Sequence, residues 1–151
     1  MALGAGARYK TRMADDYAGD VPPKQAWDIL SKDKDAVLVD VRTDAEWLFV
    51  GLPDLAVLGK EPVRIAWQTY PGMNLNPDFV EAVKAAAPKK DAQILFLCRS
   101  GQRSKSAAIA LTQVGYSRCY NIAEGFEGDK DANAHRSTVG GWKFAGLPWK
   151  Q

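Results

Sequence analysis

The chain has 151 residues, a formal net charge of +2, a hydrophobic content of 46% and a charged content of 25%. These values are close to the averages of folded domains and exclude a disordered chain, which needs low hydrophobicity and high net charge. The length suggests one domain. The small positive charge gives no reason to expect nucleic acid or a membrane as a partner.

The chain contains two cysteines, Cys98 and Cys119, which are too few for a disulfide framework and do not form a CxxC pair. Free thiols indicate a reducing compartment, so we expect a cytoplasmic protein. The apolar runs are far shorter than the roughly 18 residues of a membrane span. We expect residues 1–20 to form a loose tail and residues 21–151 to form the domain.

The predicted elements alternate between helices and short strands. In chain order they are a helix from Pro22 to Leu30, strands at Ala36 to Val41 and Val63 to Ala66, a helix from Asp78 to Ala87, a strand at Gln93 to Leu97, a helix from Ser104 to Val114 and a strand at Arg118 to Ile122.

Two kinds of signal support these elements. Proline at the first helical positions, apolar residues three or four apart and Gly115 after the last helix are typical of helices. The runs AVLVDV and QILFL are typical of strands that are buried on both faces. Their alternation predicts an α/β fold with a mainly parallel central sheet and helices on both faces. The polar, turn-rich segment 129–141 is expected to be a surface loop.

The chemical signal follows the QILFL strand, where the chain reads Cys98-Arg99-Ser100-Gly101-Gln102-Arg103-Ser104. A loop that turns from a strand into a helix N-terminus can direct backbone N–H groups at one point and bind an anion there. The positive charges of Arg99, Arg103 and Lys105 favour the thiolate of Cys98. The alternative is a buried structural cysteine, which would not require the polar residues that follow it.

The six residues from Cys98 to Arg103 match the Cys-x-x-Gly-x-Arg loop of the rhodanese family of sulfurtransferases, and the chain resembles that family from about Val21 to Trp149. The family's upstream signature corresponds to Asp40-Val41-Arg42 with Glu46, and its closing element to Trp142 with Gly146-Leu147-Pro148. Two features differ from the family pattern: Gly51-Leu52-Pro53-Asp54-Leu55 replaces the usual Gly-His-Ile-Pro-Gly-Ala, and segment 129–141 delays the closing element. Both could reshape the mouth of the pocket, which Trp47, Trp67, Trp142 and Trp149 could line.

The resemblance implies a single rhodanese-like domain in which Cys98 becomes a persulfide. Backbone amides of the loop would surround the terminal sulfur, and Arg99 and Arg103 would hold an anionic donor. The substrate-binding set is then Arg99, Ser100, Gly101, Gln102, Arg103 and Ser104. The donor would be thiosulfate or a related persulfide or polysulfide, and the acceptor cyanide, a small thiol or a thioredoxin-like protein. This chemistry needs no metal, no cofactor and no general base, which leaves His135 outside the mechanism.

Two supporting assignments stay open at this point. Asp40 and Arg42 lie at the carboxyl end of a predicted strand, where active sites of such sheets form. They either tie down the next segment, through Glu46 or backbone groups, or take part directly. Cys119 could resolve an oxidised or persulfidated Cys98, or it could be a core residue of its strand.

Rival functions use the same loop. A cysteine phosphatase places five residues between cysteine and arginine, whereas four stand between Cys98 and Arg103 here, so the loop suits a sulfur atom better than a phosphate. An arsenate reductase-like thiol enzyme, a persulfide relay and a non-catalytic binding or regulatory module remain as alternatives.

Overall fold

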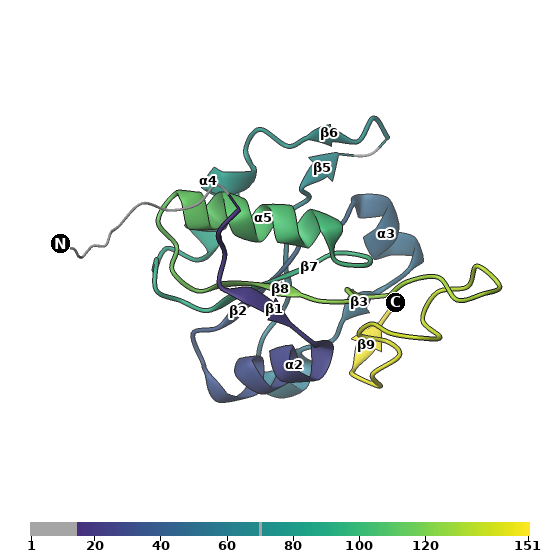
Figure 1. The fold of residues 1–151 in the computed structure, drawn as a ribbon. Helices are drawn as coiled ribbons and strands as arrows, with labels where there is room; N and C mark the ends of the chain where they lie inside the picture. Colours follow the sequence, from purple (N-terminus) through teal and green to yellow (C-terminus); the bar gives the residue numbers. More distant parts are fainter. Residues whose placement is uncertain (1–14, 70) are drawn as a thin grey trace.

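The computed structural model describes residues 15–69 and 71–151 (Figure 1). Most of the predicted N-terminal tail therefore lies outside the described residues. Within them, the central sheet has five parallel strands in the order β1-β8-β7-β2-β4. Their bounds are β1 Gly19–Val21, β2 Val37–Asp40, β4 Val63–Arg64, β7 Ile94–Leu97 and β8 Cys119–Ile122.

Helices cover both faces of this sheet, as predicted. Helices α4 (Phe79–Ala86) and α5 (Gln102–Gln113) lie on one face, and α2 (Pro23–Lys32) lies on the other (Figure 1). The fully buried strand β7 shows why both faces need cover, because successive strand residues point to opposite sides. Ile94 and Phe96 pack in the cluster with α4 and α5, whereas Leu95 and Leu97 pack in the cluster with α2.

Several small elements were not predicted from the sequence. Helix α3 (Asp44–Phe49) follows β2, the 3-10 helix η1 spans Ala56–Leu58, and two short antiparallel pairs join β3 (Leu52–Pro53) to β9 (Trp149–Lys150) and β5 (Gln68–Thr69) to β6 (Asn74–Leu75). The β3 and β9 pair brings the unusual 51–55 segment against the C-terminal end of the chain.

Strand β1 begins before the expected domain boundary at residue 21. Gly19 and Asp20 belong to β1, which pairs in parallel with β8 at the edge of the sheet. Loop 129–141 contains no helix or strand and is organised around Asp131, whose carboxylate accepts hydrogen bonds from the backbone of Asn133 and His135 and from Thr138 Oγ1. These hydrogen bonds hold the pKa of Asp131 below its usual range. No helix in the described part of the chain is long and apolar enough to cross a membrane.

Candidate active site

The Cys98 thiol lies where β7 ends and α5 begins. Its side chain is only 1% exposed. The Gly101 N–H donates to Cys98 Sγ at 3.1 Å, and Ser104 Oγ lies 3.1 Å from the same sulfur. Helix α5 begins at Gln102 rather than at the predicted Ser104, and the turn into it needs a φ of +115° at Gly101, which glycine adopts without strain. The sulfur therefore meets a backbone donor and a hydroxyl at a helix N-terminus, as anion-binding loops do.

The backbone of segment 124–128 forms hydrogen bonds with the loop that begins at Cys98. The N–H of Phe126 donates to the Cys98 carbonyl at 2.8 Å, and the N–H groups of Glu127 and Gly128 donate to the Arg99 carbonyl. Gly125 makes this approach possible with a φ of +65°, and a Cβ there would come within 2.5 Å of the Arg99 and Cys98 backbone. Main-chain hydrogen bonds thus hold the loop that carries Cys98, and the two backbones approach so closely that residue 125 has no room for a side chain.

Arg103 is placed beside the thiol, but its guanidinium is already paired. It donates to both carboxylate oxygens of Glu46, on α3, at 2.7 and 3.0 Å. Partial burial by itself lowers the pKa of Arg103, but the hydrogen bonds and charge of Glu46 raise it above its usual value. Burial acts to raise the pKa of Glu46, but the hydrogen bonds and charge of Arg103 outweigh burial and hold that pKa below its ordinary range. Arg103 thus stays cationic near Cys98.

Of the other predicted substrate-binding residues, the structure brings only some to the sulfur. Gly101 and Ser104 contact it directly. Arg99 and Gln102 have exposed side chains, and Ser100 is partly exposed. Among the described residues, the hydrogen-bonding contacts to Cys98 Sγ therefore come from one backbone amide and one hydroxyl.

Asp40 and Arg42 form a self-contained buried pair. Both side chains are 0% exposed, and Arg42 donates from Nε and Nη2 to the two Asp40 oxygens at 2.9 and 2.7 Å and from Nη2 to the Gly51 carbonyl at 2.8 Å. Of the two expected kinds of partner, backbone groups are confirmed by the hydrogen bond to the Gly51 carbonyl, whereas the carboxylate of Glu46 is paired with Arg103 instead. Two further details place the pair in the fold. The Arg42 guanidinium lies 4.3 Å from the Phe126 ring centroid, and its Nη1 is buried with no hydrogen-bond partner among the described residues.

Two residues that the sequence analysis did not single out connect the thiol to the surface. Ser104 Oγ donates to Asn121 Oδ1 at 2.5 Å, and Asn121 Nδ2 donates to Asp20 Oδ1 at 3.1 Å. The available signal for Asn121 was a polar residue within the apolar run of β8, near the carboxyl end of that strand. Nothing in the sequence marked Asp20, because it reaches Asn121 across 101 positions of the chain.

Three other expectations concern residues around the site. Cys119 is buried in the core cluster of β8, and neither cysteine of the chain, both of which are described, is in a disulfide. Trp142 was expected to line the pocket, which was wrong, because it is 0% exposed and packs edge-to-face with Trp27. Trp149 is partly exposed at 41% and stacks beneath the Lys143 ammonium at 3.9 Å.

A parallel sheet covered on both faces, with a cysteine loop between a central strand and a helix N-terminus, defines a rhodanese-like α/β domain. The chain belongs to the STR4 middle domain family, whose profile matches residues 19–151. It is 42% identical over 127 residues to the uncharacterized protein RC0915 of Rickettsia conorii, a match that covers 83% of this chain and 92% of that protein.

Two further comparisons bear on the fold and its function. The crystal structure of Rv0390 from M. tuberculosis superimposes with a TM-score of 0.82 and 46% sequence identity, over 90% of this chain and 99% of that one. A sulfurtransferase of Allochromatium vinosum is 31% identical over 96 residues, which cover 64% of this chain and 73% of that protein. The chain is thus related to sulfurtransferases at the level of the family.

Proposed function

We propose that this protein is a sulfurtransferase that takes a sulfane sulfur from thiosulfate, or from a related persulfide or polysulfide, onto Cys98 and passes it to a thiophilic acceptor. The observation that carries this proposal is the position of Cys98 Sγ, which receives the Gly101 N–H at the start of α5 with the Arg103 cation nearby. Backbone donors at a helix N-terminus stabilise negative charge on a sulfur as they do on an oxygen.

In the first half-reaction, the Cys98 sulfur attacks the outer sulfur of thiosulfate. The sulfur–sulfur bond of thiosulfate breaks, a new one forms to Cys98, and the bonding electrons leave with sulfite. Starting from the thiol, the products are the Cys98 persulfide anion and hydrogen sulfite, so the thiol proton departs on the leaving group and charge is conserved. The persulfide anion then lies in the field of Gly101 N–H and α5.

In the second half-reaction, the acceptor attacks the terminal sulfur of the persulfide. With cyanide as the probe, thiocyanate forms and Cys98 takes up one proton from water to become a thiol again. A small thiol or a thioredoxin-like partner would react at the same sulfur atom. The low exposure of Cys98 favours small donors, and a persulfide extends the reactive atom outward by one bond. Chemistry that depends on a reduced cysteine fits a reducing compartment such as the cytoplasm.

The test is to incubate the reduced protein with thiosulfate and to record the intact mass, beside Cys98→Ser and a matched Cys119→Ala variant. We expect the added mass of one sulfur atom on the wild type and on Cys119→Ala but not on Cys98→Ser, and its removal by cyanide as thiocyanate. If thiosulfate, polysulfide and a small persulfide all fail to load Cys98, the proposal is wrong, and arsenate turnover and partner binding become the next functions to test.

A further inference from the structure

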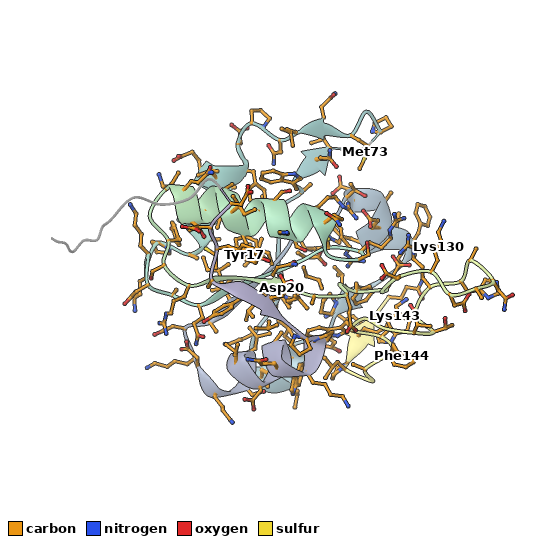
Figure 2. All side chains as sticks on the ribbon, viewed as in Figure 1. Tyr17, Asp20, Met73, Lys130, Lys143 and Phe144 are labelled. Carbon is orange, nitrogen blue, oxygen red and sulfur yellow. The ribbon has the colours of Figure 1, made fainter. Side chains whose placement is uncertain are left out.

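A chain of hydrogen bonds leads from the buried thiol to the protein surface. It runs from Cys98 Sγ to Ser104 Oγ at 3.1 Å, from Ser104 to Asn121 Oδ1 at 2.5 Å and from Asn121 Nδ2 to Asp20 Oδ1 at 3.1 Å. At its outer end the Tyr17 hydroxyl donates to the same Asp20 oxygen at 2.7 Å. Figure 2 shows Tyr17 and Asp20 close together beneath α5.

Asp20, at the surface end of this series of hydrogen bonds, fixes the direction of every hydrogen bond in the series. An ionised carboxylate can only accept, so Asn121 must turn its NH2 group toward Asp20 and its carbonyl oxygen toward Ser104. Tyr17 strengthens this arrangement because it remains a donor. Burial, followed by the hydrogen bond and the charge of Asp20, raises the pKa of Tyr17 to about 12.

At Cys98, the buried end of the series, the protons then have only one consistent arrangement. Ser104 has a single hydroxyl proton, and Asn121 Oδ1 takes it. The Ser104 oxygen can therefore only accept from Cys98, which requires that the sulfur carries its proton. With a Cys98 thiolate, Ser104 would have to turn its proton to the sulfur and leave the buried Asn121 oxygen without that donor, which costs free energy. Asn121 is 4% exposed, so water replaces the lost donor poorly.

We propose that Asp20, Asn121 and Ser104 form a protonation gate that keeps Cys98 a neutral thiol at rest and opens when the Ser104 hydroxyl turns from Asn121 to the sulfur. Asp20 and Asn121 are positioning residues, because they act on Cys98 only through Ser104. The use of this gate in catalysis rests on the proposed sulfur transfer, whereas its effect on the thiol proton does not.

The gate opposes the other groups that face the sulfur. The Gly101 N–H, the N-terminus of α5 and the Arg103 cation all favour a negative sulfur. Glu46 offsets part of the Arg103 charge, and the Asp40 charge is held by Arg42. At the outer end, Lys105 Nζ lies 6.0 Å from the Tyr17 ring centroid. A thiol that keeps its proton resists oxidation and alkylation, since both require the thiolate.

The experiment measures the pH profile of Cys98 alkylation by iodoacetamide, an uncharged reagent, in the full chain. Peptide mass analysis separates Cys98 from Cys119, and each profile is scaled to its own plateau so that differences in access cancel. The variants are Asn121→Leu, which removes the competing acceptor without changing charge, and Ser104→Ala, separately and together. Ser106→Ala, on an exposed turn of the same helix, is the matched control.

We expect Asn121→Leu to lower the midpoint of the profile by about one pH unit, a tenfold change in ionisation, because Ser104 is then free to donate to the thiolate. In the Ser104→Ala background the same substitution should move the midpoint by less than about 0.3 unit, and Ser106→Ala should leave it unchanged. If Asn121→Leu shifts the midpoint equally with Ser104 and with Ala at position 104, or shifts it in neither background, the proposed gate is wrong.

A second variant keeps the test decisive if Asn121→Leu does not fold. Asp20→Ala is at the exposed edge strand and lets the Asn121 amide turn over, so it should lower the midpoint more in the wild type than in the Ser104→Ala background. Loss of the Asp20 negative charge by itself would shift the midpoint equally in the wild type and in the Ser104→Ala background. These midpoints do not depend on sulfur loading, so failure of the gate and failure of the proposed sulfurtransferase activity are distinguished.

Discussion

The loops that follow β2 and β7 leave neighbouring strands at the same edge of the sheet, since Asp40 pairs with Leu97 in the register. Both bury polar side chains, yet they differ in how these are satisfied. At the end of β2, the charges of Asp40 and Arg42 meet in a bidentate pair, and Arg42 also donates to one backbone carbonyl. In the β7 loop, Cys98 Sγ is contacted by a backbone amide and a hydroxyl, both of which are neutral.

This difference separates a fixed ion pair from a sulfur whose hydrogen-bonding neighbour can turn. A buried bidentate pair is fixed, because moving either charge leaves the other without compensation. A sulfur next to a rotatable hydroxyl can gain or lose a proton, or a second sulfur atom, without breaking an ion pair, because the hydroxyl can turn to donate or to accept. The two loops are joined through Phe126, whose ring lies under Arg42 and whose N–H holds the Cys98 carbonyl. The Asp40–Arg42 pair thus packs against the segment that holds the Cys98 loop.

The largest effect on the fold is expected from Arg42→Met, which leaves Asp40 buried and unpaired. We expect the free energy of unfolding to fall by about 3–5 kcal/mol, measured by urea denaturation. Arg64→Met, at an exposed position on β4, should cost less than about 1 kcal/mol. A double variant Asp40→Leu with Arg42→Met should recover part of the loss. Equal losses for Arg42→Met and Arg64→Met would show that the pair is not the anchor of this edge.

Gly125→Ala should damage the β7 loop through a backbone clash. The new Cβ meets the Arg99 and Cys98 backbone at a positive φ, so we expect a loss of roughly 2–4 kcal/mol in unfolding free energy together with slower loading of Cys98 by thiosulfate. Gly59→Ala is the matched control, because Gly59 has a φ of +71° with no heavy atom within 4 Å of its Cβ position. It should cost about 1 kcal/mol and leave loading unchanged; similar losses in both variants would exclude the backbone clash.

Arg103→Ala should separate the two half-reactions of the β7 loop. It removes the cation near an anionic donor, so we expect loading from thiosulfate to slow by roughly tenfold or more, and discharge to cyanide to change less. Rapid mixing, an acid quench and an intact-mass measurement give the rates of both steps. Lys105→Ala is the control for a general loss of positive charge. Equal slowing of the two steps would contradict a role for Arg103 in holding the donor.

Glu46→Gln should give the smallest effect, and one that depends on pH. The pKa of Glu46 is lower in the folded protein than its ordinary value of 4.5 because of Arg103. The ionised pair therefore contributes stability above about pH 4.5, and this contribution is lost as the pH falls through the folded pKa.

The unfolding free energies of the wild type and Glu46→Gln should accordingly differ by about 1 kcal/mol at neutral pH and converge in acid. Glu81→Gln, which breaks an exposed pair with Lys84, is the control and should show no such pH dependence. A difference between Glu46→Gln and the wild type that stays constant down to pH 3 would mean that the side chain acts through the cap of α3 alone.

Features built from neighbouring residues were for the most part predictable from the sequence. The strand, the loop and the first turn of α5 are contiguous, so the position of Cys98 at a helix N-terminus was predictable, although the helix starts two residues earlier than expected. Helix α3 was missed even though Thr43 and Glu46 form a capping box with the right spacing, a signal that is readable in sequence.

The sequence by itself determined the parallel α/β fold and the cysteine that lies between a buried strand and a helix, because hydrophobic periodicity and local turn chemistry act between neighbouring residues. Only the tertiary structure decided the partners of the charged and polar groups. It paired Arg103 with Glu46 across 57 positions, Arg42 with Asp40 rather than Glu46, and Asp20 with Asn121 across 101 positions. The reason is physical: buried charges and hydrogen-bonding groups must be satisfied by whichever donor or acceptor the packed chain brings within about 3 Å.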